Sequence, residues 1–262
     1  MSGNAKFRWF LLAPILVALF VVVASPVISW AGKLENAQEV IVSKVVVLDS
    51  GHNPKNGGTI SHRGIKEVTY NDNIVNLIKD KLNQLPFIKV VLTRERSETI
   101  SLKSRTQISK KSIADLFLSI HHDSAQQIYL DRIITGGKKG WKTIKPIKGH
   151  SIFISKKNNY YDKSLKFAQL LGEEMIKIKR HPTLHHSEKI QGENRYLLNE
   201  HLGIYHYDTL FVLKNNYAPS VLFEIGVIVD PEDENYIIKK ENQTRIVNGI
   251  VKAIEKFFEN DC

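Results

Sequence analysis

Short apolar runs of strand length alternate with amphipathic helical segments along most of this chain, and this alternation restricts the possible folds strongly. We expect strands at 44–48, 88–93, 116–120, 151–154 and 220–223, and helices at 71–85, 102–113, 165–178 and 243–258. Strands that alternate with helices form a mostly parallel sheet with both faces covered. The sequence therefore predicts a single α/β domain, built on a mostly parallel twisted sheet with helices on both faces.

The pattern of residues at the N-terminus is typical of an exported protein. Two basic residues precede an apolar run from Phe10 to Ile28, and small residues suited to cleavage follow it before Gly32. We predict that residues 1–31 are a signal peptide; an uncleaved signal anchor that keeps the protein at the membrane is the alternative. The positive charge before the run places everything after it outside the cytoplasm, in the periplasm or cell envelope. Residues 32–43 are then a short lead-in, and residues 44–262 are expected to form the exported domain.

Charge and cysteine content exclude several classes of function. The chain carries a formal net charge of +10, and the part after residue 31 carries +8. A basic exported domain favours anionic surfaces such as wall polymers or lipid headgroups, and no nucleic-acid recognition motif is present, so we predict no nucleic-acid partner. The single cysteine, Cys262, excludes a disulfide framework and a cysteine-ligated metal site.

Two polar stretches interrupt the alternation of strands and helices. Gln126–Gly149 is rich in glycine and lysine and is expected to be a long inserted loop. Arg180–Tyr207 is expected to be a loop that lines the substrate groove or regulates access to it. It contains His181, His185 and His186, for which a second metal site is the less favoured interpretation.

Titratable side chains follow three of the predicted strands. His52 comes shortly after the first strand, His121 directly after the third, and Glu224 directly after the fifth. The carboxyl ends of parallel strands meet at one edge of a sheet, and the turn containing Glu67 can return to that edge. Two imidazoles and a carboxylate with an open fourth position are the ligands of a catalytic zinc ion, and a second carboxylate can act as general base.

These segments resemble a known family. The blocks VVVLDSGH, HRGIKE, VVLTRE, SLKSRTQIS, ADLFLSIHHD and APSVLFEIGVI, in this order from about Val45 onward, are similar to the zinc-dependent N-acetylmuramoyl-L-alanine amidases of the Amidase_3 type. The resemblance covers nearly the whole exported domain. It implies one zinc ion bound by His52, Glu67 and His121, with Glu224 as the catalytic residue.

The sequence departs from the family pattern without removing a ligand. The family's proline before Gly-His is Ser50, its glycine pair after that histidine is Asn53-Pro54, and a later phenylalanine is Val227. The residues after His121 are His122 and Asp123, which we expect either to support the ligands or to lie at the surface.

The resemblance implies that the protein hydrolyses the amide bond between N-acetylmuramic acid and L-alanine in peptidoglycan. Released stem peptides would serve cell-wall remodelling or cell separation, and a protein activator is a further expected partner. Two alternatives remain open: a latent or non-catalytic peptidoglycan-binding module, and a zinc peptidase that acts on stem peptides.

Overall fold

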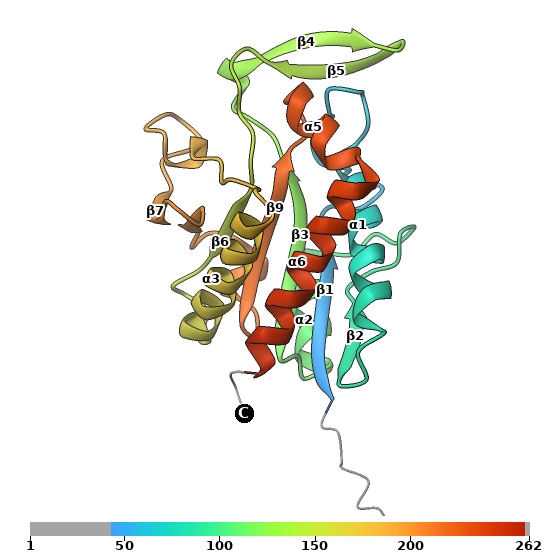
Figure 1. Ribbon diagram of the computed structural model, residues 1–262, viewed down its shortest axis with the longest axis vertical. Coiled ribbons are helices and arrows are strands. Elements are labelled where there is room, and N and C mark those ends of the chain that lie inside the picture. The colour runs from blue at the N-terminus through green and yellow to red at the C-terminus, as the bar shows by residue number, and fades with distance from the viewer. Residues whose placement is uncertain (1–42, 260–262) are drawn as a thin grey trace, which may run out of the picture. The chain divides into compact units, whose positions relative to one another are not determined.

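The structure is a computed structural model, and it describes residues 43–259 (Figure 1). The main sheet has seven strands in the order β2-β1-β3-β9-β6-β8-β7. Strands β2, β1, β3 and β9 are parallel, whereas β6 is antiparallel to β9 and β7 is antiparallel to β8. The strands are β1 (Lys44–Ser50), β2 (Ile88–Leu92), β3 (Leu116–Asp123), β6 (Ser151–Ile154), β7 (Tyr196–Asn199), β8 (Ile204–His206) and β9 (Ser220–Val227). The predicted α/β fold with a mostly parallel sheet is confirmed.

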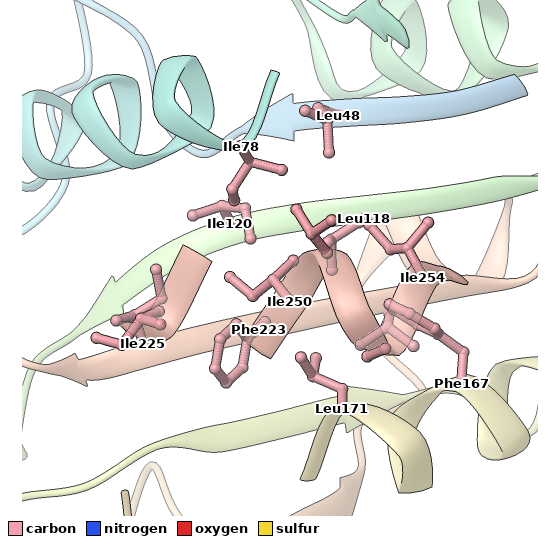
Figure 2. Close-up of a cluster of buried hydrophobic side chains, with 14 of the residues drawn as sticks. Leu48, Ile78, Leu118, Ile120, Phe167, Leu171, Phe223, Ile225, Ile250 and Ile254 are labelled. Carbon is pink, nitrogen blue, oxygen red and sulfur yellow. The ribbon is translucent and has the colours of Figure 1, made fainter. Parts of the chain in front are cut away.

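Three long helices cover one face of the sheet: α1 (Glu67–Leu82), α3 (Tyr161–Lys177) and α6 (Lys240–Glu259) (Figure 1). Figure 2 shows the core that they form with the strands, in which α6 supplies Ile250 and Ile254. The opposite face carries a smaller apolar cluster with α4 (Phe211–Lys214), and α2 (Leu102–Lys111) packs against α4. A further short helix, α5 (Pro231–Ile238), follows β9.

The alternation of side chains along the strands places His121, a predicted metal ligand, on the face of the sheet that carries α4 and α2. Val47 of β1 and Phe117 of β3 belong to the cluster on that face, while Val46 and Leu118 beside them belong to the main core. His121 is an even number of residues from Phe117, so it lies on the same face at the carboxyl end of β3.

The stretch expected to be an inserted loop, Gln126–Gly149, contains a hairpin instead. A short 3₁₀ turn, η1 (Gln127–Tyr129), leads into β4 (Leu130–Thr135), which pairs antiparallel with β5 (Lys138–Thr143). Gly136 and Gly137 form the two-residue turn with φ of 56° and 77°, the left-handed conformation that such hairpin turns need. The hairpin was not predicted because β5 has the sequence KKGWKT, which lacks an apolar run.

Arg180–Tyr207 also contains regular structure that the sequence did not predict. A 3₁₀ turn, η2 (His185–Ser187), is followed by β7 and β8, which extend the main sheet beyond β6. None of the helices within residues 43–259 is long and apolar enough to cross a membrane. The predicted signal peptide or anchor, 1–31, and the lead-in up to residue 42 lie outside the described residues.

Candidate metal centre

His52, Glu67 and His121 come from three different elements and meet at the carboxyl edge of the sheet. His52 follows β1, Glu67 is the first residue of α1, and His121 lies near the end of β3. The Nε2 atom of His52 lies 2.9 Å from Oε2 of Glu67, and Nδ1 of His121 lies 3.0 Å from Oε1 of Glu67. One ligand atom from each of the three side chains can be chosen so that all lie within 4.8 Å of one another. The sequence correctly predicted that these residues come together.

Further groups fix the orientation of the Glu67 carboxylate. Asn71, one turn later in α1, donates its side-chain N–H to Oε1 of Glu67 at 3.1 Å, and the backbone N–H of Thr59 donates to Oε2 at 3.3 Å. Burial opposes the charge of Glu67, but hydrogen bonds and positive charge from His121 and His52 hold its pKa well below the ordinary value. Glu67 is therefore ionised, as a metal ligand must be.

Two buried arginines hold the loop that carries His52. Arg105 of α2 donates to the carbonyl oxygen of Ser50 at 2.6 Å, to the carbonyl oxygen of His52, and to the carboxylate of Asp49 at 2.5 Å. Arg94 donates to the carbonyl oxygen of His52 at 2.9 Å. His52 itself has φ of 60°, a left-handed conformation that a non-glycine residue adopts when surrounding contacts enforce it.

Neither arginine was assigned a role from the sequence. One signal was present: Arg105 lies three residues before Ile108 in a predicted helix, so the two share one face of that helix, and Arg105 is buried in the structure. A charged residue at an inward position needs a buried partner, which here is Asp49.

The donor set and the surroundings fit a zinc ion. Zinc binds imidazole nitrogens and carboxylate oxygens at about 2.0–2.2 Å, so neighbouring ligand atoms around it lie roughly 3.3–3.5 Å apart. The nitrogens of His52 and His121 lie 2.9 and 3.0 Å from the two different oxygens of the Glu67 carboxylate, a few tenths of an ångström closer than this spacing, so a small movement of the side chains makes room for the ion. The two histidines also line a groove of about 400 Å³ with Leu210 and Phe211, so the cluster has an open side for water or substrate. These three side chains would hold the ion.

Glu224 lies on the strand next to His121. In the parallel pairing of β3 with β9, His121 is aligned with Glu224, and aligned residues of neighbouring strands point to the same face. The Oε2 atom of Glu224 is buried and has no hydrogen-bond partner among residues 43–259. Burial and the negative charges of Asp123 and Glu67 raise the pKa of Glu224 well above its ordinary value.

His122 points away from His121 and is not a surface residue. It is 1% exposed, and its Nδ1 atom lies 2.8 Å from Oδ1 of Asn71, the residue that orients Glu67. Burial lowers the pKa of His122 to about 3, so its ring is neutral. The expectation that His122 supports a ligand is consistent with these contacts, whereas the alternative of a surface position is wrong.

The three histidines considered for a second metal site are brought together only in part. His185 and His186 are buried beside Asp123, but His181 is exposed and lies outside this cluster. Burial opposes the charge of His186, but the neighbouring Asp123 carboxylate raises the pKa of His186 to about 9. Asp123 is therefore largely buried in an interaction network, and no pattern in the sequence indicated these partners.

Comparison with known proteins identifies the family. Residues 46–256 match the family model described as N-acetylmuramoyl-L-alanine amidase. The chain belongs to the N-acetylmuramoyl-L-alanine amidase family. The predicted resemblance is thus confirmed, and the protein is a hydrolase of this family.

Relatives of this amidase share low sequence identity over most of its length. A Buchnera aphidicola subsp. Baizongia pistaciae protein, provisionally named an N-acetylmuramoyl-L-alanine amidase, is 26% identical over 82% of this chain and 96% of its own length. The N-acetylmuramoyl-L-alanine amidase AmiA of Escherichia coli is 25% identical over 82% of this chain and 76% of AmiA.

Solved structures share the fold of this amidase. An N-acetylmuramoyl-L-alanine amidase from Clostridium difficile 630 superposes with a TM-score of 0.63 at 23% identity, over 83% of this chain and 98% of that one. The CwlD amidase from Clostridioides difficile, solved in complex with the GerS lipoprotein, gives a TM-score of 0.62 at 20% identity, over 83% of this chain and 99% of that one.

Proposed function

We propose that this protein hydrolyses the amide bond between N-acetylmuramic acid and L-alanine in peptidoglycan, with one zinc ion held by His52, Glu67 and His121. The observation that carries the proposal is the alignment of Glu224 with His121, which puts an unpartnered, buried carboxylate oxygen beside a cluster of metal-binding side chains. Family membership supports the choice of bond.

Each group has a defined task in this reaction. The bound zinc ion would polarise the amide carbonyl and lower the pKa of a water molecule. Glu224 accepts the proton of the attacking water, while the water oxygen adds to the carbonyl carbon. Glu224 then gives the proton to the nitrogen of L-alanine as the carbon–nitrogen bond breaks. The products are a carboxyl group on the muramic acid and a stem peptide with a free N-terminal alanine.

The groove next to the metal cluster supports a polymeric substrate. It is lined by His52 and His121 together with Arg105, Leu210 and Phe211. Because the groove is open to the surface, a long glycan strand can pass over it and place one amide bond next to the metal cluster. We further propose that the protein acts in the cell envelope, in the periplasm or at the membrane, and works in cell-wall remodelling or cell separation.

We also propose that a second protein activates this amidase. The related CwlD amidase was solved in complex with a lipoprotein, and this supports a search for a protein partner here as well. If the purified protein binds the wall but does not cut it, addition of extract proteins from the same compartment should restore cleavage.

The test is digestion of purified peptidoglycan by the full-length protein, with and without a zinc chelator. We expect intact stem peptides with a new N-terminal alanine, detected by mass spectrometry, from the zinc-loaded protein but not from the chelated sample. Shorter peptides would indicate a zinc peptidase. Wall that is bound but remains uncut in the presence of zinc and of the extract would indicate a binding module.

A further inference from the structure

A second cluster of metal-binding side chains lies between the end of β3 and the turn η2. Asp123 is the last residue of β3, and His185 and His186 are the first two residues of η2. The Oδ2 atom of Asp123 lies 2.7 Å from Nε2 of His186 and 3.5 Å from Nε2 of His185. The three donor atoms lie within 4.8 Å of one another, and all three side chains are largely buried. Two imidazoles and one carboxylate are again the donor set that zinc prefers.

Neighbouring residues orient each imidazole so that Nε2 faces Asp123. The Nδ1 atom of His185 lies 2.9 Å from the hydroxyl oxygen of Thr183, and Nδ1 of His186 lies 2.9 Å from Oε2 of Glu193. Histidines that bind metals commonly donate their other ring N–H to an oxygen in this way, which leaves the facing nitrogen free to bind the ion. Both histidines are therefore oriented for metal binding through Nε2.

One donor atom of the cluster lacks a partner. The Nε2 atom of His185 is buried and makes no hydrogen bond with any residue from 43 to 259. Its distance of 3.5 Å from Asp123 is longer than a hydrogen bond but close to the spacing of two ligands on one zinc ion. A buried ring nitrogen that has no hydrogen-bond partner and lies beside the carboxylate of Asp123 is available to bind a metal ion.

Charge and space at the cluster also suit a cation. Asp123 and Glu193 bring two carboxylates to the histidines, and a single guanidinium, that of Arg195, pairs with Glu193. A cavity of about 220 Å³ adjoins the cluster, with His186 and Glu224 among the residues of its wall. It can admit a water molecule as a fourth ligand.

We propose that Asp123, His185 and His186 bind a second zinc ion, separate from the ion held by His52, Glu67 and His121. This site goes beyond the proposed hydrolysis, which requires only the first ion. The composition of the cluster differs from the second metal site considered from the sequence, because Asp123 takes the place of His181.

Protonation of His186 is a competing explanation for the way in which these side chains cluster. His186 lies between the carboxylates of Asp123 and Glu193, and a protonated ring could hold the three groups together without metal. Counting bound metal ions separates the two explanations.

The test measures zinc per chain in the full-length protein, prepared without a histidine tag, loaded with zinc and freed of loose ions by gel filtration. Inductively coupled plasma mass spectrometry should find two zinc ions in the wild type and one in His185→Gln. The matched control is His181→Gln, an exposed histidine of the same segment, which should retain two. Circular dichroism should show that each variant is folded.

A second pair of measurements assigns the ions to the two sites. The variant His52→Gln should retain one ion, and the double variant His52→Gln with His185→Gln should retain none. One zinc ion in the wild type that is lost in His52→Gln would overturn the second site and leave the proposed function intact. One ion that is kept in His52→Gln and lost in His185→Gln would support the second site and contradict the first. Two ions in His185→Gln would overturn the second site.

Discussion

Replacement of Arg105 by methionine should destabilise the protein strongly, because Arg105 is the partner of a buried carboxylate. Arg105 is 2% exposed and Asp49 is 1% exposed, and Nη1 of Arg105 lies 2.5 Å from Oδ1 of Asp49. Methionine keeps a similar side-chain length but removes the charge and all of the hydrogen bonds from the guanidinium. The variant therefore tests the ion pair and these hydrogen bonds rather than the packing of α2.

The contacts around Asp49 determine the expected loss of stability. Breaking a buried ion pair by removal of one partner costs about 3–5 kcal/mol. Asp49 would keep the hydrogen bonds from the hydroxyl groups of Thr93 at 2.5 Å and Ser119 at 2.7 Å. The carbonyl oxygen of His52 would keep its hydrogen bond from Arg94. We therefore expect the free energy of unfolding to fall by about 3 kcal/mol at pH 7, the lower end of this range.

The loss should depend on pH in a defined direction. Burial alone would raise the pKa of Asp49, but Arg105, Thr93 and Ser119 hold it below the ordinary value of 3.8. In the wild type, this lowered pKa contributes stability above pH 3.8 that is lost only as the pH falls through the folded-state pKa. Without Arg105, burial raises the pKa of Asp49, so the buried carboxyl takes up a proton and the deficit of the variant shrinks as the pH falls from 7 toward 4.

Urea unfolding followed by circular dichroism at pH 7 and pH 4.5, with zinc chelated, measures both effects. Lys103→Met changes an exposed cation on the same helix and should alter stability by less than about 0.5 kcal/mol. In a double-mutant cycle, Asp49→Asn with Arg105→Met should lose less than the sum of the single variants. A loss below about 1 kcal/mol at pH 7, or an equal loss at both pH values, would show that the ion pair does not stabilise the fold in this way.

Three further changes test other parts of the structure. Asn71→Ala removes the amide that orients Glu67, so zinc affinity should fall about 10–100-fold in a competition assay with a chromophoric chelator; unchanged affinity would contradict that role. Ile250→Ala empties part of the core under α6 and should lower the free energy of unfolding, measured in urea, by about 2–5 kcal/mol. Gly58→Ala places a Cβ against the Glu67 carboxylate at φ of 74°, so it should weaken zinc binding in the same competition assay, whereas Gly136→Ala in the open hairpin turn should not.

The parts of the fold that the sequence predicted are those with a continuous apolar run or a clear helical stripe. The run KVVVL became β1 and LFLSI became most of β3, because buried parallel strands are apolar on both faces. Strands β4, β5, β7 and β8 were missed because they are short or half-exposed, and their pairing comes from contacts between distant segments.

The candidate metal centre was predicted for a related reason. His52 lies two residues after β1, and His121 and Glu224 directly follow the apolar runs of β3 and β9; the rule for parallel sheets places such residues at one edge. The partners of Asp123 could not be predicted in the same way, because His186 is 63 residues away and lies in an irregular turn. The periodicity of apolar residues within a helix or strand does not indicate a contact between residues so far apart in the sequence.

A comparison of Glu224→Gln with the wild type on purified peptidoglycan is the decisive measurement for the proposed hydrolysis. The variant should bind the same number of zinc ions as the wild type but release stem peptides with an N-terminal alanine about 10²–10⁴-fold more slowly, because glutamine cannot accept the proton. Glu173→Gln, an exposed glutamate on α3, should match the wild-type rate. Wild-type release by the zinc-loaded Glu224→Gln protein would contradict the assignment of Glu224 as the general base.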